Sequence, residues 1–202
     1  MSDANGISKR LPFLVLQIHF TMKFTELIEK RQSDRKYTNQ PVEKEKIMRC
    51  LEAARLAPSA SNSQPWTYIV SDEPEVVAKL GKASRGPLGS FNTFTGDVPV
   101  IITIVLEKPK KLTELGSRVK NKEWPLIDIG ITAEHFCLQA TEEGLGTCML
   151  GWYDEKKVKK ILNVPKEKTV ALLITMGYTP EGYKHRKKIR KPMEEMVRWN
   201  SY

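Results

Sequence analysis

The chain is poor in cysteine and histidine, with three of each among its 202 residues. The cysteines include no CxxC pair and are odd in number, which argues against a disulfide framework and for free thiols in a reducing compartment. The histidines are scattered and show no zinc-ligand spacing, so we expect no metal site. These shortages predict a cytoplasmic protein without a structural metal.

Long hydrophobic runs are also missing. The apolar stretch LPFLVLQIHF (residues 11–20) is too short for a bilayer, which needs about 20 residues. It follows two basic residues like a weak signal peptide, but no small-x-small cleavage site comes after it, and Met22 opens a stretch typical of a natural start. An upstream extension, an arm packing on a partner subunit and a signal sequence all remain open. We assign residues 1–22 to an extension and 23–202 to one domain.

What the chain has is enough hydrophobic content, 40%, for a real core, together with a net charge of +9. Such a charge favours an anionic ligand or partner. It does not choose between nucleic acid, a membrane surface and a phosphate-bearing cofactor.

The periodicity of apolar residues predicts alternating helices and strands. Helices are expected around 24–28, at 47–57 before Pro58, at 72–84, at 125–143 and after Asp154; strands at 67–70, 98–106, 146–152 and 170–178. This mixed order predicts an α+β or α/β sandwich around a central sheet. Residues 107–124 are polar and lysine-rich, and we interpret them as a surface excursion; whether they cover a pocket is left open.

The predicted helix 125–143 is apolar on nearly every side, so we expect it to be buried. Its small residues at 130, 133, 137 and 140 form a stripe against which another helix or a flat ligand could lie closely.

Residues 31–35 concentrate hydrogen-bond donors. Arg31, Ser33 and Arg35 alternate, and an extended chain would point all three side chains the same way. Two guanidiniums and a hydroxyl on one face suit a phosphate. The alternative is a solvated helix end.

The loop APSASNSQPW (57–66) carries small polar residues between two prolines. It could hydrogen-bond a polyol chain or the edge of a heterocycle, or simply connect a helix to a strand. The basic run KHRKKIRK (184–191) adds a third candidate, which could also be a nucleic-acid patch.

Taken in order, these motifs resemble the nitroreductase family of flavoproteins. R-x-S-x-R-x-Y is followed by A-P-S-A-x-N-x-Q-P-W, then by DIGITAEHFCLQATEEGLGTCMLGW (128–152), TMGYTPEG (175–182) and KIRKPMEE (188–195). The resemblance covers about 24–198. It implies a three-layer α/β/α sandwich around a mostly antiparallel sheet, in a domain-swapped type of homodimer with one FMN site per subunit at the interface.

The resemblance also implies roles for particular residues. Those at the FMN phosphate and the nearby ribityl oxygens would be Arg31, Ser33, Arg35, Lys188 and Arg190. Those lining the isoalloxazine from the other subunit would be Pro58, Ser59, Ala60, Asn62 and Gln64. Leu150 and Gly151 would bring the backbone close to the flavin ring. Asn92 is a candidate for a polar contact from 82–97, and Asp128 is more typical of a structural role.

The implied activity is transfer of electrons from NADH or NADPH through FMN to an electron-poor acceptor such as a nitroaromatic or quinone, by a ping-pong mechanism. Flavin N5 carries the chemistry, so no catalytic side chain is expected. Variable loops shape such pockets, so the natural acceptor does not follow from these motifs. Alternatives are other FMN chemistry on this fold (reductive dehalogenation, small-molecule dehydrogenation or flavin fragmentation) and a basic nucleic-acid-binding protein; we expect neither a nucleic-acid nor a membrane partner.

Overall fold

The computed structural model describes residues 22–86, 91–110, 116, 119–120 and 122–202. The expected N-terminal extension therefore lies almost entirely outside the described residues, as does part of the expected surface excursion at 107–124.

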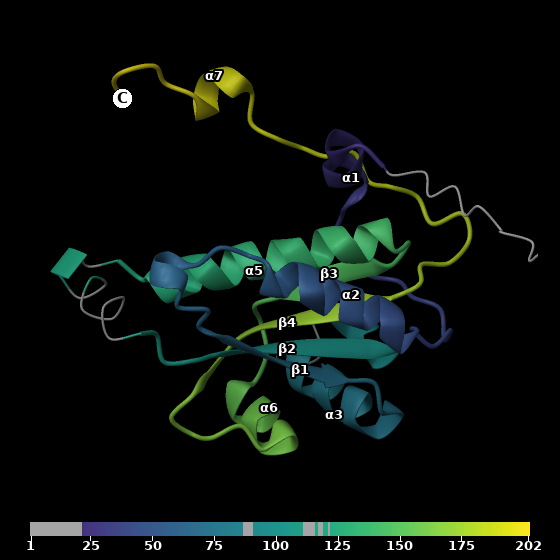
Figure 1. The fold of residues 1–202 in the computed structure, drawn as a ribbon. Helices are drawn as coiled ribbons and strands as arrows, with labels where there is room; N and C mark the ends of the chain where they lie inside the picture. The colour runs from purple at the N-terminus through teal and green to yellow at the C-terminus, as the bar shows by residue number, and fades with distance from the viewer. Residues whose placement is uncertain (1–21, 87–90, 111–115, 117–118, 121) are drawn as a thin grey trace, which may run out of the picture.

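A sheet of four strands forms the middle layer (Figure 1). The strands are β1 (Trp66–Ser71), β2 (Val100–Leu106), β3 (Gly146–Leu150) and β4 (Thr169–Gly177), in the order β1-β2-β4-β3 with every neighbouring pair antiparallel. β2 and β4 are central, and β2 is buried along nearly its whole length. This agrees with the uninterrupted apolar sequence of its strand, since a strand covered on both faces needs no polar side.

Helices cover both faces of the sheet, as Figure 1 shows. α2 (Lys44–Arg55) and α5 (Trp124–Glu142) lie on one face, while α3 (Pro74–Ser84) and α6 (Glu155–Leu162) lie on the other. The shorter helices are α1 (Phe24–Lys30), η1 (Ala60–Asn62), η3 (Thr93–Gly96) and α7 (Met193–Met196). The predicted three-layer sandwich with an antiparallel sheet is confirmed, although α2 ends slightly before the expected Ala57.

Local signals set the helix boundaries. Pro74 occupies the first turn of α3, and the carboxylate of Asp154 accepts the Lys157 N–H at 3.1 Å to cap α6. Gly144, just beyond the end of α5, adopts a φ of 77°, a left-handed conformation that glycine enters without steric cost.

The long helix α5 departs from expectation on one side. Ala133, Cys137 and Ala140 are buried in the core to which α2 also contributes. Most of the small-residue stripe therefore packs against α2. The first turns, however, leave Leu126 and Ile127 exposed by 47% and 52%. The prediction of burial on nearly every side is therefore wrong for this part of the helix in a single chain.

The chain beyond β4 forms a C-terminal arm (residues 179–202) that leaves the body and ends far from it (Figure 1). Its apolar side chains include Ile189, Met193, Met196 and Trp199, all exposed. Within the described part of the chain, the model contains no helix with the length and apolar content needed to cross a bilayer.

Candidate anion-binding site

The first part of the site is the extended stretch 31–35. Helix α1 ends at Lys30, and Arg31 takes φ −59° and ψ 125°, so the chain becomes extended there as expected. Ser33 forms a parallel bridge with Thr147 of β3, and the Asp34 N–H donates to the Thr147 carbonyl at 2.8 Å. The stretch thus runs along the outer edge of β3.

The second part is the C-terminal arm, which returns to this stretch. The Arg186 N–H donates to Oε1 of Gln32 at 3.0 Å, and its guanidinium donates to the Ser33 carbonyl. The Lys188 ammonium donates to the Arg31 carbonyl. Segments more than 150 residues apart in sequence therefore lie side by side.

Between them lies a cationic hollow of about 370 Å³ lined by Arg31, Gln32, Ser33, Arg186, Lys187, Lys188, Ile189 and Arg190. Four of the five residues expected at a phosphate line it together. Arg35 lies beside it instead: its guanidinium donates to the Ser33 carbonyl at 3.3 Å, and its N–H donates to the Tyr183 hydroxyl at 3.2 Å.

Arg31, which lines the hollow, has a donor that is only partly satisfied. Its Nε lies 3.1 Å from Oε1 of Glu134, close enough for an ion pair. The geometry nevertheless leaves this buried N–H without a hydrogen bond to any described residue. The angle matters more than the distance here, because a hydrogen bond weakens steeply when misaligned. The ion pair with Glu134 therefore leaves this donor short of a well-aligned acceptor, and the charge of Arg31 suits an anionic ligand in the hollow.

The charges around Lys188 also fit an anion. Burial lowers the pKa of its ammonium, and repulsion from Arg31 and Arg190 lowers it further. Cations held close together in this way are stabilised by a bound negative charge.

Gly151 stands at the other end of β3. Leu150 is buried, whereas Gly151 is exposed, and no described atom lies within 4 Å of where its Cβ would be. From Thr147 to Gly151 the strand advances roughly 13 Å, at about 3.3 Å per residue. The hollow and this open glycine suit an elongated ligand with an anionic end and a flat end.

The 58–64 loop is held rigidly but elsewhere. Ser61, Asn62 and Gln64 take φ values of 52°, 50° and 47°, which are strained for residues with a Cβ. The Gln64 N–H donates to Ser59 Oγ at 2.9 Å, and the Ala60 N–H donates to the Asp128 carboxylate at 3.1 Å. Asp128 thus anchors the loop near the start of α5, and none of residues 58–64 lines the cationic hollow.

Other candidates have internal roles. The amide of Asn92 donates to the carbonyls of Ser84 at 3.0 Å and Trp152 at 3.2 Å, so it ties loops together. Trp66 packs against the core.

Four residues that line the hollow were not predicted as site residues from the sequence: Gln32, Arg186, Lys187 and Ile189. Arg186 alternates with Lys188 and Arg190, a spacing that an extended segment would place on one side. Glu134, the counter-charge to Arg31, carries no local signal on its helix.

The similarity of this chain to known proteins agrees with this architecture. The sequence profile described as "Nitroreductase family" matches residues 28–90 and 88–178, and the chain belongs to that family. YdgI of Bacillus subtilis, named as an inferred NAD(P)H nitroreductase, is 28% identical, with 89% of this chain and 98% of that protein covered.

Solved structures extend the similarity. An FMN-dependent nitroreductase from Clostridium difficile is 28% identical, covers 87% of this chain and 98% of its own, and superposes with a TM-score of 0.68. A nitroreductase family protein from Streptococcus pneumoniae is 26% identical, with 88% and 100% covered and a TM-score of 0.74. A more distant relative, from Thermotoga neapolitana, is named iodotyrosine deiodinase; it is 22% identical, with 88% and 97% covered.

Proposed function

We propose that this chain is an FMN-dependent oxidoreductase that transfers electrons from NADH or NADPH to an electron-poor acceptor such as a nitroaromatic or a quinone. The observation that carries the proposal is the cationic hollow, where Arg31 and Ser33 of the extended stretch meet Lys188 and Arg190 of the arm. The family membership and the names of its relatives support the same cofactor and electron donor.

The residues present fit the phosphate of FMN. Arg31, Lys188 and Arg190 supply positive charge and N–H donors, and Ser33 adds a neutral hydroxyl. Arg35 and Arg186 lie next to this set and add to its positive potential. Leu150 and Gly151 would lie against the flavin ring, with the missing side chain at Gly151 leaving room for it.

The second half of the site comes from a second copy of the chain. Residues Pro58, Ser59, Ala60, Asn62 and Gln64 would line the ring from the partner, which agrees with their separation from the hollow in one chain. The exposed Leu126 and Ile127 of α5 and the apolar arm offer surfaces for that homodimer. Burial of such surfaces is the main driving force of association.

FMN held by these residues would supply the two-electron redox chemistry that links hydride donation by the nicotinamide to reduction of the acceptor. The protein binds the phosphate, orients the ring and keeps one face open for the two substrates in turn. If both substrates use one pocket, the kinetics are ping-pong, because the oxidised nicotinamide must leave before the acceptor enters.

The test is steady-state kinetics of the FMN-loaded protein with NADH or NADPH and with a nitroaromatic or a quinone. The proposal predicts turnover above that of free FMN and parallel lines when the donor is varied at several fixed acceptor concentrations. Turnover no faster than free FMN with every pair of substrates would contradict it.

Reductive dehalogenation is a second candidate, because one relative is named a deiodinase. It predicts slow turnover with nitroaromatics and rapid halide release from a halogenated phenol by the reduced protein. Absence of halide release from that substrate would remove this candidate.

A further inference from the structure

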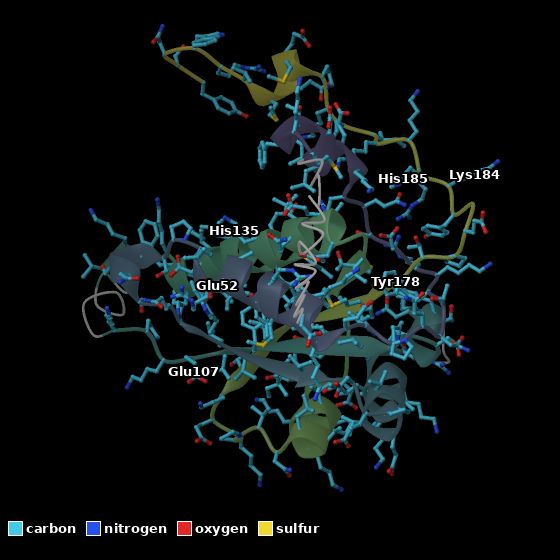
Figure 2. The ribbon with its side chains drawn as sticks, turned by 45° about the vertical axis from the view of Figure 1, so that its right-hand side comes forward. Glu52, Glu107, His135, Tyr178, Lys184 and His185 are labelled. Carbon is cyan, nitrogen blue, oxygen red and sulfur yellow. The ribbon has the colours of Figure 1, made fainter. Side chains whose placement is uncertain are left out.

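The extended stretch 31–35, which borders the cationic hollow, has a second, buried side. Asp34 faces a back cavity of about 230 Å³, and Gln32 borders both this cavity and the cationic hollow. The two residues are only 7% and 9% exposed. Tyr183 and His185 of the arm line the back cavity too, and Figure 2 shows His185 on the inner side of the arm while Lys184 points away.

Gln32 joins the two halves of the hollow. Its Oε1 accepts the main-chain N–H of Arg186 at 3.0 Å. Because the bond is made to the backbone, it fixes the path of the arm just before Lys188 and Arg190. The contacts that Arg186 and Lys188 make through their own side chains are less suited to this task, since those cations are free to turn toward a bound anion.

The other end of the same amide faces away from the hollow. Burial raises the pKa of the Asp34 carboxyl, and the amide of Gln32, together with His185 and Arg186, opposes that rise. The amide nitrogen of Gln32 therefore lies near the Asp34 carboxylate, although it forms no well-aligned hydrogen bond with any described residue. With its oxygen on the arm and its nitrogen on the Asp34 side, the amide is placed to hold the arm.

We propose that Gln32 is the positioning residue of the phosphate clamp, by which we mean the residues Arg31, Ser33, Lys188 and Arg190 at the cationic hollow. The amide oxygen of Gln32 holds the backbone of Arg186. This contact sets the positions of Lys188 and Arg190 relative to the other two residues. The inference rests on the proposed function, because the clamp is taken to hold the phosphate of FMN. It assigns to a neutral side chain the task of assembling a cationic site before the ligand arrives.

The test compares the full-length wild type with Gln32→Met, which keeps the shape of the side chain and loses the amide. Two properties are measured: the ratio of the dissociation constants for riboflavin and FMN, which differ by the phosphate, and the rate of tryptic cleavage of the arm in flavin-free protein. Loss of one buried hydrogen bond predicts an FMN preference lower by about tenfold. Cleavage after Arg186 and Lys188 should become several-fold faster.

Thr141→Val is the matched control. Thr141 lines the same back cavity and is similarly buried, but its hydroxyl donates to the Cys137 carbonyl within α5 rather than to the arm. Both properties should stay at the wild-type values in this variant. Gln32→Asn, which keeps an amide but shortens its reach, is the second test variant if the methionine variant folds poorly, and the same losses are expected.

Three outcomes would overturn the inference. An unchanged FMN preference would show that the clamp forms without Gln32. A lower FMN preference with unchanged arm cleavage would make Gln32 a direct ligand contact, and an equal loss of riboflavin and FMN affinity would make its role generally structural. A wild-type chain that binds no flavin contradicts the proposed function itself, and is distinct from all three.

Discussion

At the scale of single residues, polar groups that are already hydrogen-bonded within the protein differ from those at the candidate site. The donors of the 58–64 loop and of Asn92 are engaged within the protein, and this makes them rigid parts of the frame. The Nε–H of Arg31 is buried and lacks a hydrogen bond within the described part of the chain. Its ion pair with Glu134 is misaligned, and its place beside the cationic hollow, rather than the missing hydrogen bond alone, points to an anionic ligand.

Removing two cations of the clamp should release the cofactor. Arg31→Ala combined with Arg190→Ala deletes two charge-assisted contacts, each worth about 1.5–3 kcal/mol, so the FMN dissociation constant should rise at least about a hundredfold. Equilibrium titration by flavin fluorescence measures this, and far-UV circular dichroism checks the fold. The control is Lys184→Ala, which removes a charge from the outer side of the arm (Figure 2) and should leave affinity within about twofold. Full flavin occupancy in the double variant would refute the clamp.

The buried carboxyl of Asp34 should make stability depend on pH. Burial raises its pKa above the ordinary value of 3.8, so the folded state holds this proton more tightly than the unfolded state does. The stability of the folded state therefore decreases as the pH rises from about 3.8 through the folded-state pKa of Asp34. Asp34→Asn should raise the melting temperature at pH 7, and the gain should shrink toward pH 4. A gain that is the same at both pH values would contradict this origin.

At the scale of elements, most of the fold follows from the sequence, because burial sets the period of apolar residues. The buried run of β2, the proline start of α3, the cap of α6 and the length of α5 could all be predicted. The pairing of 31–33 with 186–188 follows from no local pattern, because the segments are so far apart; only the family resemblance placed Arg31 and Lys188 at one phosphate. No local pattern marks Glu134 either, because its role depends on where α1 and the arm come to lie.

One close approach between elements should not tolerate a side chain. A Cβ on Gly81 of α3 would lie 2.3 Å from the carbonyl oxygen of Thr95 in η3. Gly81→Ala should lower the free energy of unfolding by about 1–3 kcal/mol, because backbone must move. Urea denaturation measures the change, with Lys82→Ala on the exposed side of the same helix as control, expected within about 0.5 kcal/mol of wild type. A stability equal to wild type would show that η3 shifts freely.

At the scale of the whole molecule, a single chain leaves its apolar surface and its site unfinished. The start of α5 and the C-terminal arm expose large apolar side chains. The cationic hollow and the 58–64 loop, both expected at one cofactor, lie apart. A second copy of the chain would cover the exposed apolar surface and would complete the cofactor site, which is why we propose a homodimer.

A charge placed on the exposed start of α5 should therefore weaken both dimer formation and FMN binding. Ile127→Lys should shift the sedimentation of the 23.1 kDa chain from dimer toward monomer, with the dimer dissociation constant raised at least about tenfold. FMN content should fall in parallel, because half of the site would be lost. The control is Lys156→Glu, a charge change on an exposed residue of α6, which lies on the opposite face of the sheet from α5. A wild-type monomer that keeps its FMN would contradict the shared site.

The N-terminal extension should be dispensable. Deleting residues 1–21 leaves Met22 as the start of the described domain, and we predict unchanged FMN content and unchanged sedimentation. Absorbance at the flavin bands per chain measures the first, and analytical ultracentrifugation the second. Loss of either would show that the extension is an arm that packs on the partner subunit.

The most direct test of the account is the visible absorption spectrum of the purified chain, followed by that of the supernatant after heat denaturation. The account predicts flavin bands and a released ligand that co-migrates with FMN. A colourless protein that also takes up no added FMN would contradict it, and would leave the cationic hollow to a different anion.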